Sequence, residues 1–340
     1  MNYWRRRSLM LLLALSASLT VGSHCRADRR DRLEAPPAAI AQAASAEAPA
    51  YEQRDLDWVD ASRARAVPAR LYWPKQVADG ARVPLVVFSH GIGGSRRGYS
   101  YLGAYWSSQG IASLHVQHVG SDRELWFGNP LTLVSRLQDA AQEREALNRV
   151  GDVRFALDQM LHGEWAAHID TERIVAAGHS YGANTTLLLA GARVTRAGQA
   201  LDLREPRIKA AIIISAPPFY GEPDVAAILQ AIRIPTLHIT STEDVIRIPG
   251  YYSDARDRVR VFEATGSATK ALAVFEGGSH SMFTDRAGTG GALLNPQVKA
   301  ATKDLTLAFL RSVLDGRDDG LRGWSERYRD ILARWLSQGS

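Results

Sequence analysis

A single cysteine, Cys25, is present among the 340 residues, and this scarcity excludes two kinds of site. One thiol cannot form a disulfide within the chain, so the fold must be stabilised by packing. It also cannot supply the several thiolates of a zinc site. The sequence further lacks H-E-x-x-H, a zinc-protease motif, and G-x-x-x-x-G-K-[ST], a phosphate-binding loop. We therefore expect no metal site.

The chain also lacks a strong excess of charge of one sign. Of the formal net charge of +5, Arg5, Arg6 and Arg7 supply three, and residues 1–23 contain no acidic residue, which leaves +2 for the rest of the chain. Proteins that bind nucleic acid normally present a large basic surface. We therefore expect no nucleic-acid partner.

No hydrophobic run is long enough to span a bilayer comfortably, because a transmembrane helix needs about 20 apolar residues. The apolar stretch 9–21 follows the three arginines and precedes the small residues Gly22 and Ser23. This layout is typical of an export signal peptide, which we predict for residues 1–23. The alternatives are an uncleaved anchor or a buried helix. With the signal removed, we expect a periplasmic or secreted protein without a stable membrane span.

Two further features bear on the export route. Residues 6–10, Arg-Arg-Ser-Leu-Met, also suit a twin-arginine signal. Cys25 stands where a bacterial lipoprotein would be acylated, but His24 occupies the preceding position, where such a site needs a small residue. Lipid anchoring at Cys25 is therefore the lesser alternative.

The ordered part of the chain is predicted to begin near Tyr51. Residues 24–50 are rich in Ala, Pro, Arg and Glu without an apolar period, which indicates a flexible spacer. Residues 51–340 are predicted to form one catalytic domain. Two strands should open it, and Pro68 favours an edge strand because proline cannot donate a ladder hydrogen bond.

Short apolar runs alternate with helix-like stretches through the rest of the sequence. The runs are 84–90, 111–116, 173–178, 209–215, 235–240 and 271–276, and the helix-like stretches include 99–108, 139–161, 181–192 and 297–314. This alternation predicts an α/β fold with a mostly parallel sheet and helices on both faces. Apolar residues at helical spacing between Trp324 and Leu336 predict a final helix that closes the core, with a membrane or partner contact as the alternative.

Residues 178–182, Gly-His-Ser-Tyr-Gly, follow one of these runs and precede a helix-like stretch. A serine between two glycines in a strand-turn-helix is the pattern of a nucleophile elbow. The turn strains the backbone and exposes the hydroxyl at the carboxyl edge of the sheet, where ligands of such folds bind. Ser180 is therefore the candidate nucleophile.

A serine hydroxyl needs a base and the base needs an acid. His280 follows the last core strand in a glycine-containing loop and is the candidate base. Glu243 and Asp244 follow the strand 235–240, and either carboxylate could orient that histidine. His90, His115 and His179 are interpreted as packing or hydrogen-bonding residues.

Residues 90–95, His-Gly-Ile-Gly-Gly-Ser, also follow a strand. Glycines let such a loop approach a ligand closely, and its backbone N–H groups could stabilise a developing oxyanion. The predicted donors are the amides of Ile92 and Tyr181. The alternatives are a plain turn or a phosphate cradle.

Taken together, these elements resemble the α/β-hydrolase superfamily from about Leu56 to the helix near residue 314. Residues 84–122 and the run Gly-His-Ser-Tyr-Gly-Ala are similar to the bacterial group that resembles dienelactone hydrolases and platelet-activating-factor acetylhydrolases, with some similarity to cutinase-type polyesterases. The resemblance implies the chain order Ser, Asp, His, which favours Asp244 over Glu243. It also implies no cofactor. Dienelactone hydrolases use a cysteine nucleophile, so Ser180 favours ordinary serine esterase chemistry instead.

The sequence thus predicts an exported serine hydrolase that cleaves small-molecule or polymeric carboxylic esters through an acyl-enzyme on Ser180. The alternatives are an amide or peptide hydrolase with the same triad and a non-catalytic binding protein. The segment 121–149 is either a substrate wall or a surface connection. The predicted substrate-contacting residues are Trp126, Phe127, Phe219, Tyr220, Met282 and Phe283.

Overall fold

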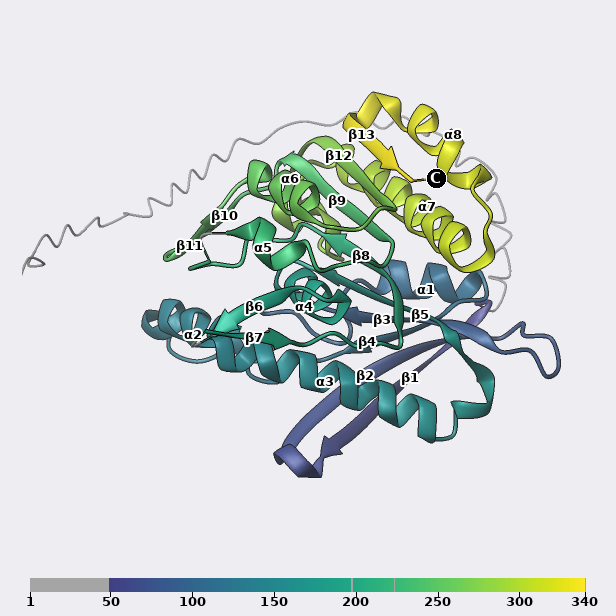
Figure 1. Ribbon diagram of the computed structural model, residues 1–340, viewed down its shortest axis with the longest axis horizontal. Coiled ribbons are helices and arrows are strands. Elements are labelled where there is room, and N and C mark those ends of the chain that lie inside the picture. Colours follow the sequence, from purple (N-terminus) through teal and green to yellow (C-terminus); the bar gives the residue numbers. More distant parts are fainter. Residues whose placement is uncertain (1–48, 197, 223, 340) are drawn as a thin grey trace, which may run out of the picture. The chain divides into compact units, whose positions relative to one another are not determined.

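A nine-stranded sheet forms the centre of the fold (Figure 1). The computed structural model describes residues 49–196, 198–222 and 224–339, and Ala48–Ser340 form one unit. The strands of the sheet are β1 (Tyr51–Asp60), β2 (Arg65–Pro74), β3 (Val83–Ser89), β4 (Ala112–Val116), β5 (Ile169–His179), β8 (Ile208–Ile214), β9 (Thr236–Glu243), β12 (Lys270–Ser279) and β13 (Leu332–Gln338). The predicted signal peptide, 1–23, and nearly all of the spacer, 24–50, lie outside the described residues.

The spatial order of the strands is β1-β2-β4-β3-β5-β8-β9-β12-β13. The neighbours from β4 to β12 are parallel, whereas β1, β2 and β13 join antiparallel at the two sides. The helices are α1 (Ser100–Ser108), α2 (Leu133–Ala140), α3 (Glu143–His162), α4 (Tyr181–Ala190), α5 (Val225–Leu229), α6 (Ala255–Ala264), α7 (Leu294–Asp315) and α8 (Asp319–Arg327). Two small hairpins pair β6 (Arg193–Arg196) with β7 (Gln199–Asp202) and β10 (Ile246–Ile248) with β11 (Tyr251–Ser253).

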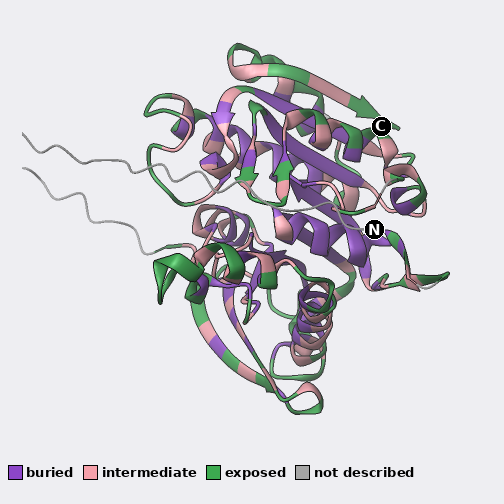
Figure 2. Ribbon diagram, turned by 90° about the vertical axis from the view of Figure 1, so that its left-hand side faces the viewer, coloured by how far each residue is buried: buried purple, intermediate pink, exposed green. Residues whose placement is uncertain are grey.

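Helices cover both faces of the sheet because successive strand residues face opposite sides. In β3, Leu85 and Val87 join a core cluster with α3 and α4, whereas Val86 and Phe88 join the cluster formed with α1 and α7. Figure 2 shows the central strands as buried. Burial on both faces explains the continuous apolar runs of the sequence. The predicted α/β-hydrolase fold class is confirmed.

The prediction that Pro68 marks an edge strand is wrong, because β2 lies between β1 and β4. The Pro68 carbonyl accepts a hydrogen bond from the Gln117 N–H at 2.8 Å, and the β2–β4 register begins only at Ala69. In an antiparallel ladder the N–H and C=O of one residue point to the same neighbour. The missing N–H of Pro68 therefore falls where the ladder with β4 ends and costs no strand pairing.

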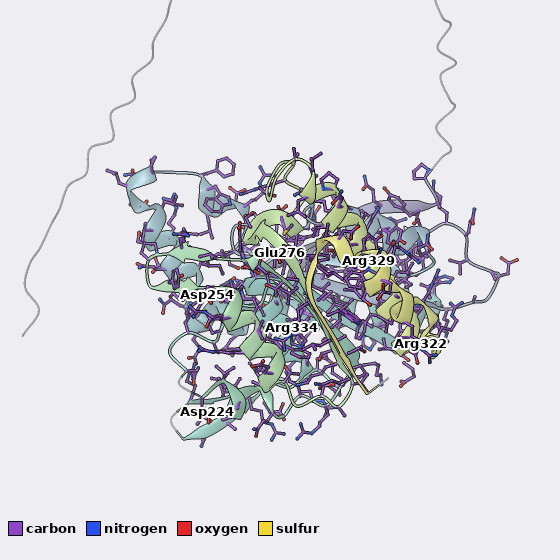
Figure 3. The ribbon with its side chains drawn as sticks, turned by 90° about the horizontal axis from the view of Figure 1, so that it is seen from above. Asp224, Asp254, Glu276, Arg322, Arg329 and Arg334 are labelled. Atoms are coloured by element: carbon purple, nitrogen blue, oxygen red, sulfur yellow. The ribbon has the colours of Figure 1, made fainter. Side chains whose placement is uncertain are left out.

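The prediction of one helix through residues 324–336 is also wrong. Helix α8 ends at Arg327, and β13 then pairs antiparallel with β12, with Leu336 opposite Leu272. Figure 3 labels Arg329 and Arg334, which flank this change of structure. The outer edge of β12 would otherwise present unpaired backbone groups. A strand distant in sequence offers those hydrogen bonds, and no local spacing reveals it.

Trp324 ties α8 to the rest of the core, and its replacement by alanine should destabilise the fold. The side chain is 1% exposed, donates from Nε1 to the Ala301 carbonyl at 2.9 Å, and packs against Phe275 and Trp335. Trp324→Ala should lower the free energy of unfolding by about 3–5 kcal/mol in a urea titration. Leu293→Ala, at a position 85% exposed, is the control and should change it by less than about 0.5 kcal/mol. Equal effects of the two changes would contradict the packing described.

Candidate active site

Strand β5 passes into helix α4 through a strained turn at Ser180. The backbone of Ser180 has φ 56° and ψ −123°, a conformation rare for a residue with a Cβ, and its N–H donates to the Ile214 carbonyl of β8 at 2.9 Å. A Cβ added at Gly178 would overlap the Gly182 carbonyl, and one added at Gly182 would overlap the Ser89 carbonyl of β3. Both glycines are therefore required by the close approach of strand and helix.

The structure brings Ser180, His280 and Asp244 together at the carboxyl ends of β5, β12 and β9. His280 opens a short 3-10 turn, η5 (His280–Phe283), and its Nε2 lies 2.8 Å from Ser180 Oγ. Its Nδ1 lies 2.7 Å from Asp244 Oδ1. A carboxylate only accepts, so Nδ1 carries the proton and Nε2 is free to accept from the serine hydroxyl. Asp244 is fully buried, whereas the alternative acid, Glu243, is exposed.

The Asp244 carboxylate has two further donors. Thr240 Oγ1 donates to Oδ2 at 2.8 Å, and the Arg258 guanidinium donates to Oδ1 at 3.2 Å. Burial alone would raise the pKa of Asp244, but His280 and Arg258 outweigh it and hold that pKa well below its ordinary value. The acid is therefore ionised and fixed in orientation.

The loop after β3 lies directly against the serine. A Cβ added at Gly91 would come within 3.1 Å of Ser180 Cβ. The Gly91 carbonyl accepts from the Gly94 N–H at 3.0 Å and from His90 Nδ1 at 2.7 Å. The N–H of Ile92 belongs to the same trans peptide, so it points away from those two donors. Among the described residues, neither the Ile92 nor the Tyr181 amide donates a hydrogen bond to another protein group.

His90 orients this peptide in one tautomer. The backbone N–H of His118 donates to His90 Nε2 at 3.1 Å, so Nδ1 carries the proton that reaches the Gly91 carbonyl. Burial lowers the pKa of His90 well below its ordinary value, so the ring is neutral. The guanidinium of Arg149, in helix α3, donates to the His90 carbonyl. These contacts agree with the interpretation of His90 as a hydrogen-bonding residue.

His179 holds the backbone of the candidate base. Its Nε2 donates to the His280 carbonyl at 3.0 Å, so its Nδ1 accepts from the Tyr99 hydroxyl at 2.8 Å. Burial lowers the pKa of His179 to about 3. Tyr99 was not predicted as a site residue, because its partner lies 80 positions away in the sequence.

A cleft of about 800 Å³ opens above Ser180. Its walls come from the loop after β3, the start of α3, the β6–β7 hairpin and the β10–β11 hairpin. Trp126, Phe219 and Tyr220 line it as predicted, and the segment 121–149 contributes to the wall. Trp126 Nε1 donates to the Gly93 carbonyl at 2.7 Å and so also holds the loop after β3.

Three of the residues predicted to contact substrate do not line the cleft. Phe127 is 56% exposed and does not line the cleft; Arg123 lies over its ring instead. Met282 and Phe283 are fully buried because η5 turns them beneath His280 into the core shared with α7. The prediction also missed Val194, Leu201 and Leu203, which line the cleft from the β6–β7 hairpin and the residue after it. The turn residue Gly198, with φ 80°, was the available signal for this hairpin.

Within residues 49–196, 198–222 and 224–339, no group of His, Cys, Asp and Glu side chains is arranged to hold a metal ion. The same residues include no helix with the length and hydrophobicity needed to cross a membrane.

Comparison with known proteins supports the α/β-hydrolase fold. Residues 59–124 match the family described as platelet-activating factor acetylhydrolase, isoform II, a stretch that includes the loop after β3 but none of Ser180, Asp244 and His280. A solved structure of ferulic acid esterase from Streptomyces cinnamoneus is similar with a TM-score of 0.61 and 22% identity, over 82% of this chain and 94% of that chain. A search of curated proteins found no match. The chain has the α/β-hydrolase fold, and the predicted resemblance is confirmed.

Gly182→Ala should damage the elbow, because the new Cβ would meet the backbone carbonyl of Ser89. We expect a loss of about 1–3 kcal/mol in the free energy of unfolding, as for an overpacked core. Gly323→Ala is the matched control, since Gly323 is also helical but a Cβ there has no atom within 4 Å. It should stabilise by about 0.5–1 kcal/mol. Thermal or urea unfolding of both variants measures the difference, and a stabilising Gly182→Ala would refute the contact.

Buried neutral histidines should make the fold sensitive to acid. Burial lowers the pKa of His115 to about 4 and those of His118, His179 and His238 to about 3. An unfolded histidine has a pKa of about 6.5, so this stability is fully present above that pH and is lost as pH falls through the folded pKa values of about 4 and 3. Each residue should lower the free energy of unfolding by up to about 1.4 kcal/mol for each unit by which the pH falls in this range. Urea titrations at several pH values between 7 and 5 give the free energy of unfolding at each pH. This free energy should fall less steeply with decreasing pH in His238→Leu than in the wild type, and an identical dependence on pH would contradict the account.

Proposed function

We propose that this protein is an exported serine hydrolase that cleaves carboxylic esters through an acyl-enzyme on Ser180. The observation that carries the proposal is the hydrogen-bonded series in which Ser180 Oγ lies 2.8 Å from His280 Nε2 and His280 Nδ1 lies 2.7 Å from Asp244. This series stands at the base of an open cleft. A nucleophile, a base and an orienting acid within hydrogen-bond reach are what acyl transfer requires.

In the proposed reaction, His280 Nε2 takes the proton of Ser180 while Oγ attacks the ester carbonyl carbon. The carbonyl oxygen becomes an oxyanion, which the unpaired amides of Ile92 and Tyr181 stabilise; one such donor is typically worth about 2.7–4 kcal/mol. The imidazolium, held by Asp244, then gives its proton to the leaving alcohol. His280 then takes a proton from a water molecule whose oxygen attacks the acyl carbon. The bond between that carbon and Ser180 Oγ breaks, the carboxylic acid leaves, and His280 returns the proton to Oγ.

The comparisons support an ester rather than an amide substrate. The matched family and the similar structure are both named for enzymes that cleave esters, an acetylhydrolase and a ferulic acid esterase. The cleft, lined by Trp126, Phe219 and the apolar residues of the β6–β7 hairpin, would accept the apolar part of a small ester or one end of a polymer. Export rests on the signal pattern of residues 1–23, with a periplasmic or secreted location as the expected outcome.

Ser180→Ala should lower kcat/KM for p-nitrophenyl esters by at least about a thousandfold, by analogy with other triad deletions. A series of acyl chain lengths, compared with the matching p-nitroanilides, measures both the loss and the bond preference. A fluorophosphonate probe should label the wild type and leave Ser180→Ala unlabelled.

Ser135→Ala is the control, because Ser135 is an exposed serine on α2. It should hydrolyse esters and accept the probe as the wild type does. Retained turnover in Ser180→Ala would reject the nucleophile, and faster cleavage of anilides than of esters would reject the ester preference.

A further inference from the structure

Helix α6 brings a buried cation to the candidate catalytic acid. Arg258 is 3% exposed, and its guanidinium donates to Asp244 Oδ1, the same oxygen that receives the Nδ1 proton of His280. Among the described residues, Asp244 is the only ion-pair partner of Arg258. Its Nε and its other terminal nitrogen have no hydrogen-bond partner in the same part of the chain. The one strong interaction of this cation is therefore with the triad.

The position of Arg258 follows from the local sequence. Asp254, labelled in Figure 3, caps α6, and its side chain and that of Asp257 form a reciprocal capping box. The helix buries Arg258 on the face that also carries Val261 and Phe262. A guanidinium on an apolar face is costly because it stays charged and must be desolvated. An aliphatic residue would satisfy packing at less cost, so folding alone does not explain an arginine here.

We propose that Arg258 is a positioning residue that limits how strongly Asp244 stabilises the protonated form of His280. The negative carboxylate favours the imidazolium, and a cation on the same oxygen offsets part of that attraction. The guanidinium hydrogen bond also fixes the rotation of the carboxylate. This inference rests on the proposed function, because it needs His280 to act as the base.

Other charged groups near His280 do not account for the same effect. His179, whose ring centre lies 4.8 Å from that of His280, is neutral because burial lowers its pKa to about 3. Glu243, opposite Ser279 in the β9–β12 register, is exposed, as are Asp285 and Arg286 at the rim of the cleft. Solvent screens exposed charges far more than a buried pair. Arg258 itself also acts on the pKa of Tyr220, whose rise on burial it opposes, and on that of His179, which it lowers further.

The test is the pH dependence of kcat/KM for a p-nitrophenyl ester in the wild type and in Arg258→Gln. Removal of the cation should move the acid limb of the profile to higher pH by about one unit, so the variant loses about tenfold in rate below the limb. Arg258→Lys keeps the charge and should keep the wild-type limb. Arg260→Gln is the matched control: it removes an arginine from the same helix at a side chain 72% exposed, and the limb should not move.

Each outcome decides the matter. A uniform loss of rate in Arg258→Gln with an unmoved limb would show a merely structural role and overturn the proposal. Should the neutral variant fail to fold, a folded Arg258→Lys with a displaced limb would overturn it equally, and a Lys variant with the wild-type limb would support it. A wild type that neither hydrolyses esters nor accepts a fluorophosphonate probe would instead reject the proposed function, which separates the two failures.

Discussion

The site depends on one close backbone contact, the approach of Gly182 to the carbonyl of Ser89 at the end of β3. No Cβ fits between them, so helix α4 lies directly against the strand that leads into the loop of residues 90–95. The contact places the strained Ser180 beside Gly91, the residue before Ile92. A Cβ at Gly178 would meet the Gly182 carbonyl and one at Gly182 would meet the Ser89 carbonyl, so a larger residue at either glycine would force α4 away from the neighbouring strand and displace Ser180.

Buried polar groups around this contact hold it rigid. The neutral rings of His90 and His179 each donate one hydrogen bond and accept another. His90 donates to the loop after β3, at the Gly91 carbonyl. His179 donates to the backbone carbonyl of His280. A buried group without such partners would cost stability, so the network is favourable only in this one arrangement. The histidines that do not react therefore position the groups proposed to react, and their burial keeps them uncharged.

Charge is distributed unevenly around the triad. Asp244 lies between His280 and the buried Arg258, whereas the carboxylate next to it in sequence, Glu243, faces solvent. Asp244 therefore lies between a permanent cation and the histidine proposed to act as the base. The open side of the site is the cleft, whose apolar wall comes from short elements added to the parallel sheet, such as the β6–β7 hairpin.

The sequence by itself determined the α/β architecture, because strands buried on both faces leave continuous apolar runs. It also revealed the elbow, because glycines stand two positions before and two positions after Ser180 at the junction of a strand and a helix. It also named Ser180 and His280, whereas the choice of Asp244 over Glu243 came from the family resemblance. Tertiary structure decided what depends on partners distant in the chain: the pairing of β13 with β12, the burial of Met282 and Phe283, and the hold of Tyr99 on His179. Arg258 belongs with these cases, since its contact with Asp244 joins a helix and a strand end 14 residues apart in the sequence. Local patterns record which face of an element is buried, whereas only the folded chain specifies what lies against that face.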